Sequence, residues 1–259
     1  MTCVTKIRGY SLIELLIALA IAGVIGGAIL GVYKVSQDTY VRASSLEAAQ
    51  DGARAGLDRM ANELRLIGSY WVGASGAGNA IATALPGSIT FQADVNADTL
   101  NATGDEITLT AQANSGNNSI SVNRTTGSVG GNAFTAGEWV YIANGATQEV
   151  KQIGPGYTTG LTIPLTIPLT FTFTGPPQPA IVRTVETTTY TLNGTSLTRN
   201  GFGIVDNVTA LTFTYFQKDG VTPATGLTDI REIKINLTVQ SPDGSARYMT
   251  TRVKLRNLP

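Results

Sequence analysis

The residue with the clearest chemical consequence in this sequence is Glu14, a single carboxylate inside an apolar stretch. It is the only charged side chain between Arg8 and Lys34, and the run from Leu15 to Val32 carries no charge. That run is long enough to cross a bilayer as a helix. Ionisable groups inside a membrane segment are rare because hydrocarbon cannot solvate them, so we expect Glu14 to be functional and to have a specific cationic partner.

The residues around Glu14 form a recognisable pattern. A short basic leader is followed by a glycine, an aromatic residue, a small hydroxylated residue, two aliphatic residues and a carboxylate: Gly9, Tyr10, Ser11, Leu12, Ile13 and Glu14. This pattern resembles the signature of type IV prepilins. The resemblance implies that a prepilin peptidase cleaves after Gly9 and that the new terminal residue, Tyr10, is N-methylated. It also implies that Glu14, flanked by Leu12 and Ile13, pairs with the N-terminal amine of a neighbouring subunit during assembly.

The family usually has Phe at position 10 and Thr at position 11, and the Tyr and Ser found here keep the residue class. The electrostatics of the pairing agree with the resemblance. Two opposite charges removed from water attract each other more strongly than they do in water, and each one alone would be penalised. A contact that specifies the register between subunits is the expected result.

Two other interpretations of the N-terminus are a secretory signal peptide and a simple membrane anchor. Lys6 and Arg8 make a basic start, and Ala20-Ile21-Ala22 resembles a signal peptidase site. However, apolar sequence continues well past Ala22, and a signal peptide gives no reason for Glu14. An anchor that retains its leader likewise gives no reason for Gly9.

Composition narrows the classes of function. The 18 basic and 18 acidic residues balance, and removal of Lys6 and Arg8 with the leader leaves 16 against 18, a net charge of −2. We therefore expect no nucleic-acid partner. The chain has no histidine, and its only cysteine, Cys3, lies in the leader. Without these residues, Ser-His and Cys-His nucleophile pairs and the commonest metal ligand are missing, so we expect no enzyme and no cofactor.

A second pattern extends the apolar helix. After Lys34, apolar residues recur at spacings of three and four, which predicts an amphipathic helix that ends near Gly68. These residues are Leu46, Ala49, Ala53, Leu57, Met60, Leu64 and Ile67. A coiled-coil stalk is the alternative, although Ala and Gly residues interrupt the row of large apolar side chains that a coiled coil needs. Within the membrane half, Gly23, Gly27 and Gly31 recur every four residues and would permit close packing of neighbouring helices.

Beyond Gly68 the composition shifts to Thr, Gly, Asn and Val, which indicates β structure. We predict a hairpin of 187–192 and 196–199 around Asn193-Gly194, then strands at 208–216, 230–240 and 246–255. The last three should form a sheet with one buried face against Leu57, Met60 and Leu64. Shorter strands are predicted at 107–111, 119–123 and 138–142. Pro164 and Pro168 cannot donate ladder hydrogen bonds, so we expect the run 161–174 to be an edge strand or a loop. Its role would be either a docking surface for a neighbouring subunit or a plain connector.

We therefore predict an α+β chain with the type IV pilin fold. Its expected parts are a leader (1–9), a transmembrane half-helix (10–33), an amphipathic half-helix (34–68), an inserted β-rich subdomain (69–180) and a C-terminal antiparallel sheet (181–259). One weak metal site is considered. A degenerate calcium loop is resembled by Asp94, Asn96, Asp98 and the later Asp105, although Thr99 stands where such a loop normally has Gly. A solvated turn is the alternative.

Residues 52–68 and 205–216 resemble W-type minor pilins and J-type pseudopilins of type II secretion. The resemblance implies initiation or tip assembly of a filament. Expected partners are the prepilin peptidase and methyltransferase, other pilins or pseudopilins, and an inner-membrane assembly platform. We expect an inner-membrane protein with its head outside the cytoplasm, later found in a pilus or pseudopilus, because the leader is basic. The alternatives are a filament-displayed adhesin or glycan-binding module, and a major filament-forming pilin.

Overall fold

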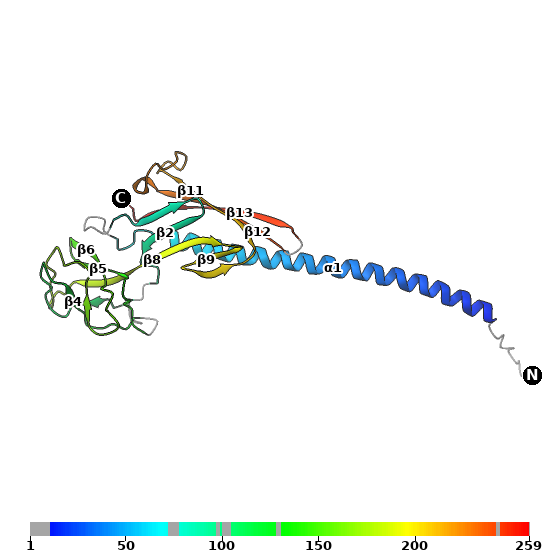
Figure 1. Cartoon of the computed structure of the whole chain (residues 1–259), viewed down its shortest axis with the longest axis horizontal. Helices are drawn as coiled ribbons and strands as arrows, with labels where there is room; N and C mark the ends of the chain where they lie inside the picture. The colour runs from blue at the N-terminus through cyan, green and yellow to red at the C-terminus, as the bar shows by residue number, and fades with distance from the viewer. Residues whose placement is uncertain are drawn as a thin grey trace, which may run out of the picture.

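The structure is a computed structural model that describes residues 11–71, 78–96, 99, 105–127, 131–241 and 244–258. A single long helix, α1 (Leu12–Arg65), precedes antiparallel strands, so the chain has the α+β architecture of the type IV pilin fold. Figure 1 shows the first half of α1 extending away from a head that is built on its second half. The leader, including Gly9, and Tyr10 lie outside the described residues.

Helix α1 contains 54 residues and is about 81 Å long at 1.5 Å per residue. It ends three residues before Gly68, with Leu66 as its C-cap. Gly68 has a φ of +82°, and a Cβ on it would lie 2.8 Å from a methyl carbon of Leu258. Both the backbone conformation and the close approach of Leu258 therefore require glycine at position 68, just after the helix.

The helix packs on a three-stranded antiparallel sheet in the order β11 (Val208–Phe216), β12 (Glu232–Gln240) and β13 (Ala246–Lys254). Alternate residues of β12 are fully buried: Ile233, Ile235, Leu237 and Val239. They share one core with Leu57, Met60 and Leu64 of α1. The predicted strands and the predicted contact between the sheet and the helix are confirmed, because a period of two gives each strand one apolar face.

A larger sheet surrounds one long strand, β8 (Ile181–Asn193). Its members are antiparallel partners: β1 (Ile81–Leu85), β2 (Ser88–Ala93), β3 (Ile107–Thr108), β5 (Trp139–Asn144), β6 (Thr147–Gln152), β9 (Ser196–Arg199) and β10 (Phe202–Val205). The second half of β8 forms the predicted hairpin with β9, and the 3-10 helix η2 (Leu227–Asp229) follows β11. The first half of β8 pairs with β3 and β5. Strand β8 therefore connects the part of the head that contains β2 and β9 with the part that contains β3 and β5.

The segment predicted as one inserted subdomain is divided among three apolar clusters: the core beneath α1, a separate second core, and a small cluster of Tyr141, Ala143 and Val150 with Val185. Ile81, Ile89 and Phe91, on β1 and β2, join the core beneath α1 because β2 pairs along the second half of β8. Residues from Ile107 to Val182 build a separate second core. In Figure 1 this second part lies at the end of the head remote from the N-terminus. These groups separate because β2 pairs with the second half of β8, whereas β3 and β5 pair with its first half.

The run 161–174 is an edge segment, as its prolines predicted. Its first residues form β7 (Thr162–Pro164), which pairs with β4 (Ser119–Ser121) in a two-stranded sheet. Ile163, Leu169 and Phe173 are buried in the second core, whereas Ile167 and Phe171 are exposed. The run thus contributes to a core on one side and presents apolar side chains on the other.

Candidate functional site

The first half of α1 is an apolar surface without a partner inside the described part of the chain. An 18-residue window of this helix has 0% of its residues buried, and its length and composition suffice to cross a membrane. Leu12 is 80% exposed and Ile13 is 65% exposed. So large an apolar surface is unstable in water and requires lipid or neighbouring helices.

Glu14 lies in the first turn of this helix. Its Oε2 accepts a hydrogen bond from the backbone N–H of Ser11 at 2.9 Å. The first N–H groups of a helix have no partner within the helix, and a carboxylate near them is also favoured by the helix dipole. The local structure therefore holds the Glu14 carboxylate at the N-terminal end of α1, beside Ser11, the second residue after the predicted processing junction.

Three of the four glycines in the membrane half, Gly23, Gly27 and Gly31, leave space around one face of the helix. A Cβ built on Gly23, Gly27 or Gly31 would meet no atom within 4 Å. All three lie in the exposed half of α1 and recur at the spacing that places residues on one helix face. Their predicted role, close packing against another helix, concerns contacts between molecules and stays a prediction.

The helix is fixed to the head near its other end by Glu63. Its carboxylate accepts hydrogen bonds from the Arg199 Nε at 2.7 Å, the Tyr190 hydroxyl at 2.8 Å and the Arg59 Nε at 3.1 Å. Burial alone would raise the pKa of Glu63, but these hydrogen bonds outweigh burial and hold its pKa below the ordinary value of 4.5. Burial and the bond to Glu63 raise the pKa of Tyr190. This cluster fixes how the head is oriented on α1.

The calcium candidates lie beside arginines. The Asp94 carboxylate forms an ion pair with the Arg183 Nη1 at 3.4 Å, and Arg183 also pairs with Glu106. The Arg183 guanidinium stacks 4.4 Å from the centre of the Tyr70 ring. The Asp105 backbone carbonyl accepts a hydrogen bond from Arg124. Asp94, the first of the proposed ligands, therefore already shares a guanidinium with Glu106.

Asp98 lies outside the described residues, whereas Asn96 lies within them. Across the described ranges, no three His, Cys, Asp or Glu side chains converge as metal ligands. The calcium site stays a prediction.

Sequence reasoning did not single out Arg183 or Glu106. Their pairing joins β8 to a residue 77 positions earlier, so no local spacing reveals it. The available signal was the position of Arg183 near the start of a strand of mostly apolar and hydroxylated residues, where a buried charge needs a partner.

Comparison with known proteins adds information on the N-terminus alone. Residues 5–30 match the family model described as the prokaryotic N-terminal methylation motif. No curated protein and no solved structure matches the chain. The matched residues contain the Gly9-Tyr10 junction and Glu14, and they continue into the exposed apolar half of α1. The motif and the long-helix α+β fold together support a prepilin of the type IV pilin kind, with a membrane-anchored N-terminal helix and processing by prepilin peptidase.

Proposed function

We propose that this chain is a minor pilin or pseudopilin that takes part in initiating or capping a type IV pilus or a type II secretion pseudopilus. The observation that carries the proposal is the exposed apolar half of α1 with Glu14 as its only carboxylate. In the membrane, lipid covers this surface; in a filament, neighbouring α1 helices replace the lipid. Cleavage after Gly9 and methylation of Tyr10 would then create the cation for Glu14.

The roles of individual residues follow from this arrangement. Glu14 pairs with the terminal amine of a neighbour, and Leu12 and Ile13 pack beside that contact. Gly23, Gly27 and Gly31 let adjacent helices approach closely. The described Glu14 hydrogen bond to the Ser11 N–H supports the first role, because the carboxylate is already held at the end of the helix where the amine of a neighbour would arrive.

The size of the head favours a minor subunit over a major one. Its second core, from Ile107 to Val182, extends the head beyond the sheet that packs on α1. Each subunit of a helical array has neighbours on all sides, and so bulky a head would crowd them. A subunit at the filament tip has free space above it. Resemblance of 52–68 and 205–216 to W-type and J-type subunits supports the same assignment.

Two measurements test the proposal. Intact mass and N-terminal sequencing of the protein from membranes of a strain with its own prepilin peptidase should give a chain that starts at Tyr10 and is about 14 mass units heavier than the bare sequence. Glu14→Ala should leave membrane insertion intact but remove the protein from sheared filaments or reduce filament number. Glu47→Ala is the matched control, because Glu47 is also an exposed carboxylate on α1. Normal incorporation of the Glu14 variant would refute the assembly role.

A filament-displayed adhesin is the second candidate, favoured by one observation. Ile167 is 60% exposed and Phe171 is 45% exposed, and both belong to the run 161–174, whose buried residues pack in the second core. Replacing both by Ser should abolish attachment while sparing filament number if this surface binds a target. A fall in filament number would instead assign the surface to assembly.

A further inference from the structure

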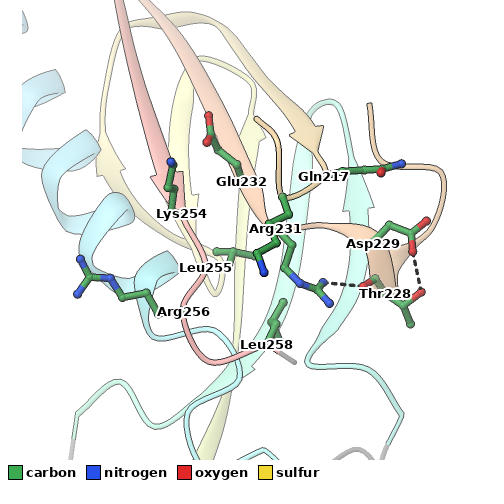
Figure 2. A pocket seen from close by; sticks show the side chains of 10 residues that line it. Gln217, Thr228, Asp229, Arg231, Glu232, Lys254, Leu255, Arg256 and Leu258 are labelled. Atoms are coloured by element: carbon green, nitrogen blue, oxygen red, sulfur yellow. Dashed lines mark hydrogen bonds between the residues drawn. The ribbon is translucent and has the colours of Figure 1, made fainter. Parts of the chain in front are cut away.

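A hollow of about 720 Å³ lies where the chain end passes β12 and η2. Its volume is in the range of sites that hold small molecules. Four cations line it: Lys218, Arg231, Lys254 and Arg256. Figure 2 shows Arg231 in the middle of these side chains, reaching toward Thr228, with Lys254 and Arg256 on the other side.

Two carboxylates, Asp229 and Glu232, also line this hollow, and Asp219 follows the lining residue Lys218 in the chain; all three have hydrogen-bond partners. Glu232 forms an ion pair with Arg252 at 2.8 Å. Asp229 accepts a hydrogen bond from the Thr225 hydroxyl at 2.7 Å. Asp219 accepts hydrogen bonds from the backbone N–H groups of Val221 and Thr222 at 3.0 and 2.9 Å. Glu232 is therefore compensated by Arg252, whereas these donors to Asp229 and Asp219 are neutral; the four lining cations outnumber the two lining carboxylates.

The cations, in contrast, are in excess. Residues 244–258 contain no carboxylate but carry four cations: Arg247, Arg252, Lys254 and Arg256. Lys218, Lys254 and Arg256 are exposed, and none of them has an ion-pair partner among the described residues. The chain as a whole has no excess of positive charge, so this concentration is local. Such a hollow attracts an anion.

The centre of the hollow is rigid. The Arg231 guanidinium donates to the carbonyl of Thr228 at 2.6 Å and to that of Ile230 at 2.9 Å. Its backbone N–H donates to Phe216, and its carbonyl accepts from the N–H of Leu255. A cation held in this way loses little freedom when it binds a ligand, which favours affinity.

A second hollow of about 200 Å³ adjoins the first, because Thr228, Arg231 and Leu258 line both. Trp71 and Asn257 also line the second hollow. An indole ring provides apolar area for the face of a sugar ring, and amide and hydroxyl groups can hydrogen-bond to sugar hydroxyls. The two hollows together offer cations, one aromatic ring and neutral polar groups.

The position of the hollow argues against the chain's own membrane as the ligand. The Asn257 side chain donates to the carbonyls of Arg65 and Leu66 at the last turn of α1, each at 3.4 Å. The hollow is therefore at the end of α1 opposite Leu12, and α1 is about 81 Å long. A ligand at this end comes from the surroundings of the head.

We propose that this hollow binds an acidic oligosaccharide of the uronate type. The carboxylates of the sugar face Lys218, Lys254 and Arg256 around the fixed Arg231, and a neighbouring ring enters the hollow beside Trp71. The inference goes beyond the proposed role in assembly and does not depend on it, since the hollow is built from a single chain.

Binding is measured on the full-length chain in a neutral detergent, by fluorescence anisotropy of labelled tetragalacturonate at about 50 mM salt, where charges are weakly screened. We expect saturable binding that weakens as salt is added. The double variant Lys254→Gln/Arg256→Gln should weaken it about tenfold or more, because two charge-assisted hydrogen bonds are lost. Both side chains are exposed, so the fluorescence melting midpoint of the head should not change.

Lys234→Gln is the matched control, since Lys234 lies on the same sheet opposite Arg252 but does not line the hollow. It should bind as the unchanged chain does. An equal loss in the control would overturn the proposal, because the attraction would then be unspecific. Absence of binding would also overturn it, as would tighter binding of polyglutamate, of duplex DNA or of the methyl-esterified oligomer. No filament is present in this experiment, so its result is independent of the assembly proposal.

Discussion

The carboxylate of Glu63 and the guanidinium of Arg199 join the helix to the hairpin across 136 residues of sequence, with 2.7 Å between Glu63 Oε2 and Arg199 Nε. Glu63 is 13% exposed and Arg199 is 21% exposed, so both charges are largely removed from water. The contact fixes β9 against α1. A charge pair in this position stabilises one orientation of the head, and either member alone would be left buried without its partner.

Glu63→Gln is expected to destabilise the head by about 1–3 kcal/mol at neutral pH, because a hydrogen-bonded charge pair is lost. The measurement is urea unfolding of the full-length chain in detergent, followed by tryptophan fluorescence. Both tryptophans, Trp71 and Trp139, lie in the head with 5.0 Å between their ring centres. Arg59→Gln is the control and should cost about 0.5 kcal/mol or less, since Arg59 is 52% exposed. Equal losses would contradict the assignment.

The stability of the head should also depend on pH through Glu63. The folded pKa of Glu63 lies below 4.5, so its contribution is present above that pH and is lost as the pH falls through the lower, folded value. The unchanged chain should therefore lose stability more steeply than Glu63→Gln between about pH 5 and pH 3. If the stability of the two proteins falls equally with pH, another carboxylate is responsible for the loss of stability in acid.

A second contact between α1 and the head depends on Gly56. A Cβ on this residue would lie 2.2 Å from the Val205 Cγ2, closer than atoms can approach. Gly56→Ala should therefore destabilise the head by about 1–3 kcal/mol through overpacking, despite the better helix propensity of Ala. Gly52→Ala is the control, because its Cβ would meet nothing within 4 Å; it should be neutral or stabilising. Val205→Ala should rescue the Gly56 variant in the same urea measurement.

A buried ion pair holds the apolar edge segment. Glu149 and Lys151 are 0% and 4% exposed, with 3.1 Å between Glu149 Oε2 and Lys151 Nζ. Glu149 also accepts from the backbone N–H groups of Thr170 and Phe171. Glu149→Leu alone should cost about 3–5 kcal/mol, because Lys151 is left charged and buried. The double variant with Lys151→Met should be clearly less destabilised; a loss equal to or greater than that of the single variant would contradict the pairing.

The absence of a cofactor is also open to measurement. If Asp94, Asn96, Asp98 and Asp105 do not hold calcium, a chelator at about millimolar concentration should leave the melting midpoint of the head unchanged, because only ligands of the folded state shift it. The Arg183 ion pair with Asp94 supports this expectation. A lower midpoint that calcium restores, and magnesium does not, would establish the site.

Several elements could be predicted because their signals are local. The strand β11 begins and ends at Val208 and Phe216, as predicted from alternation of side chains. The hairpin between β8 and β9 follows from Asn193-Gly194, where Gly194 has a φ of +59°. The ends of some strands were predicted wrongly: the strand predicted at 107–111 spans only Ile107–Thr108.

The sequence by itself determined the N-terminal part of this protein. The motif around Glu14, the apolar run and the amphipathic continuation are all patterns between near neighbours in the chain. Helical and strand periodicity depend on such spacings, so they are visible without a structure. The family motif over residues 5–30 and the α+β fold agree with them.

Only the tertiary structure decided which distant residues meet. It divided residues 69–180 among three apolar clusters, paired Asp94 with Arg183, and gathered Lys218, Arg231, Lys254 and Arg256 around one hollow. These contacts depend on the order of strands around β8 and on where the chain end crosses β12. The physical reason is that local alternation fixes which face of a strand is apolar, but not which distant strand or side chain it meets; that choice depends on packing across the whole head.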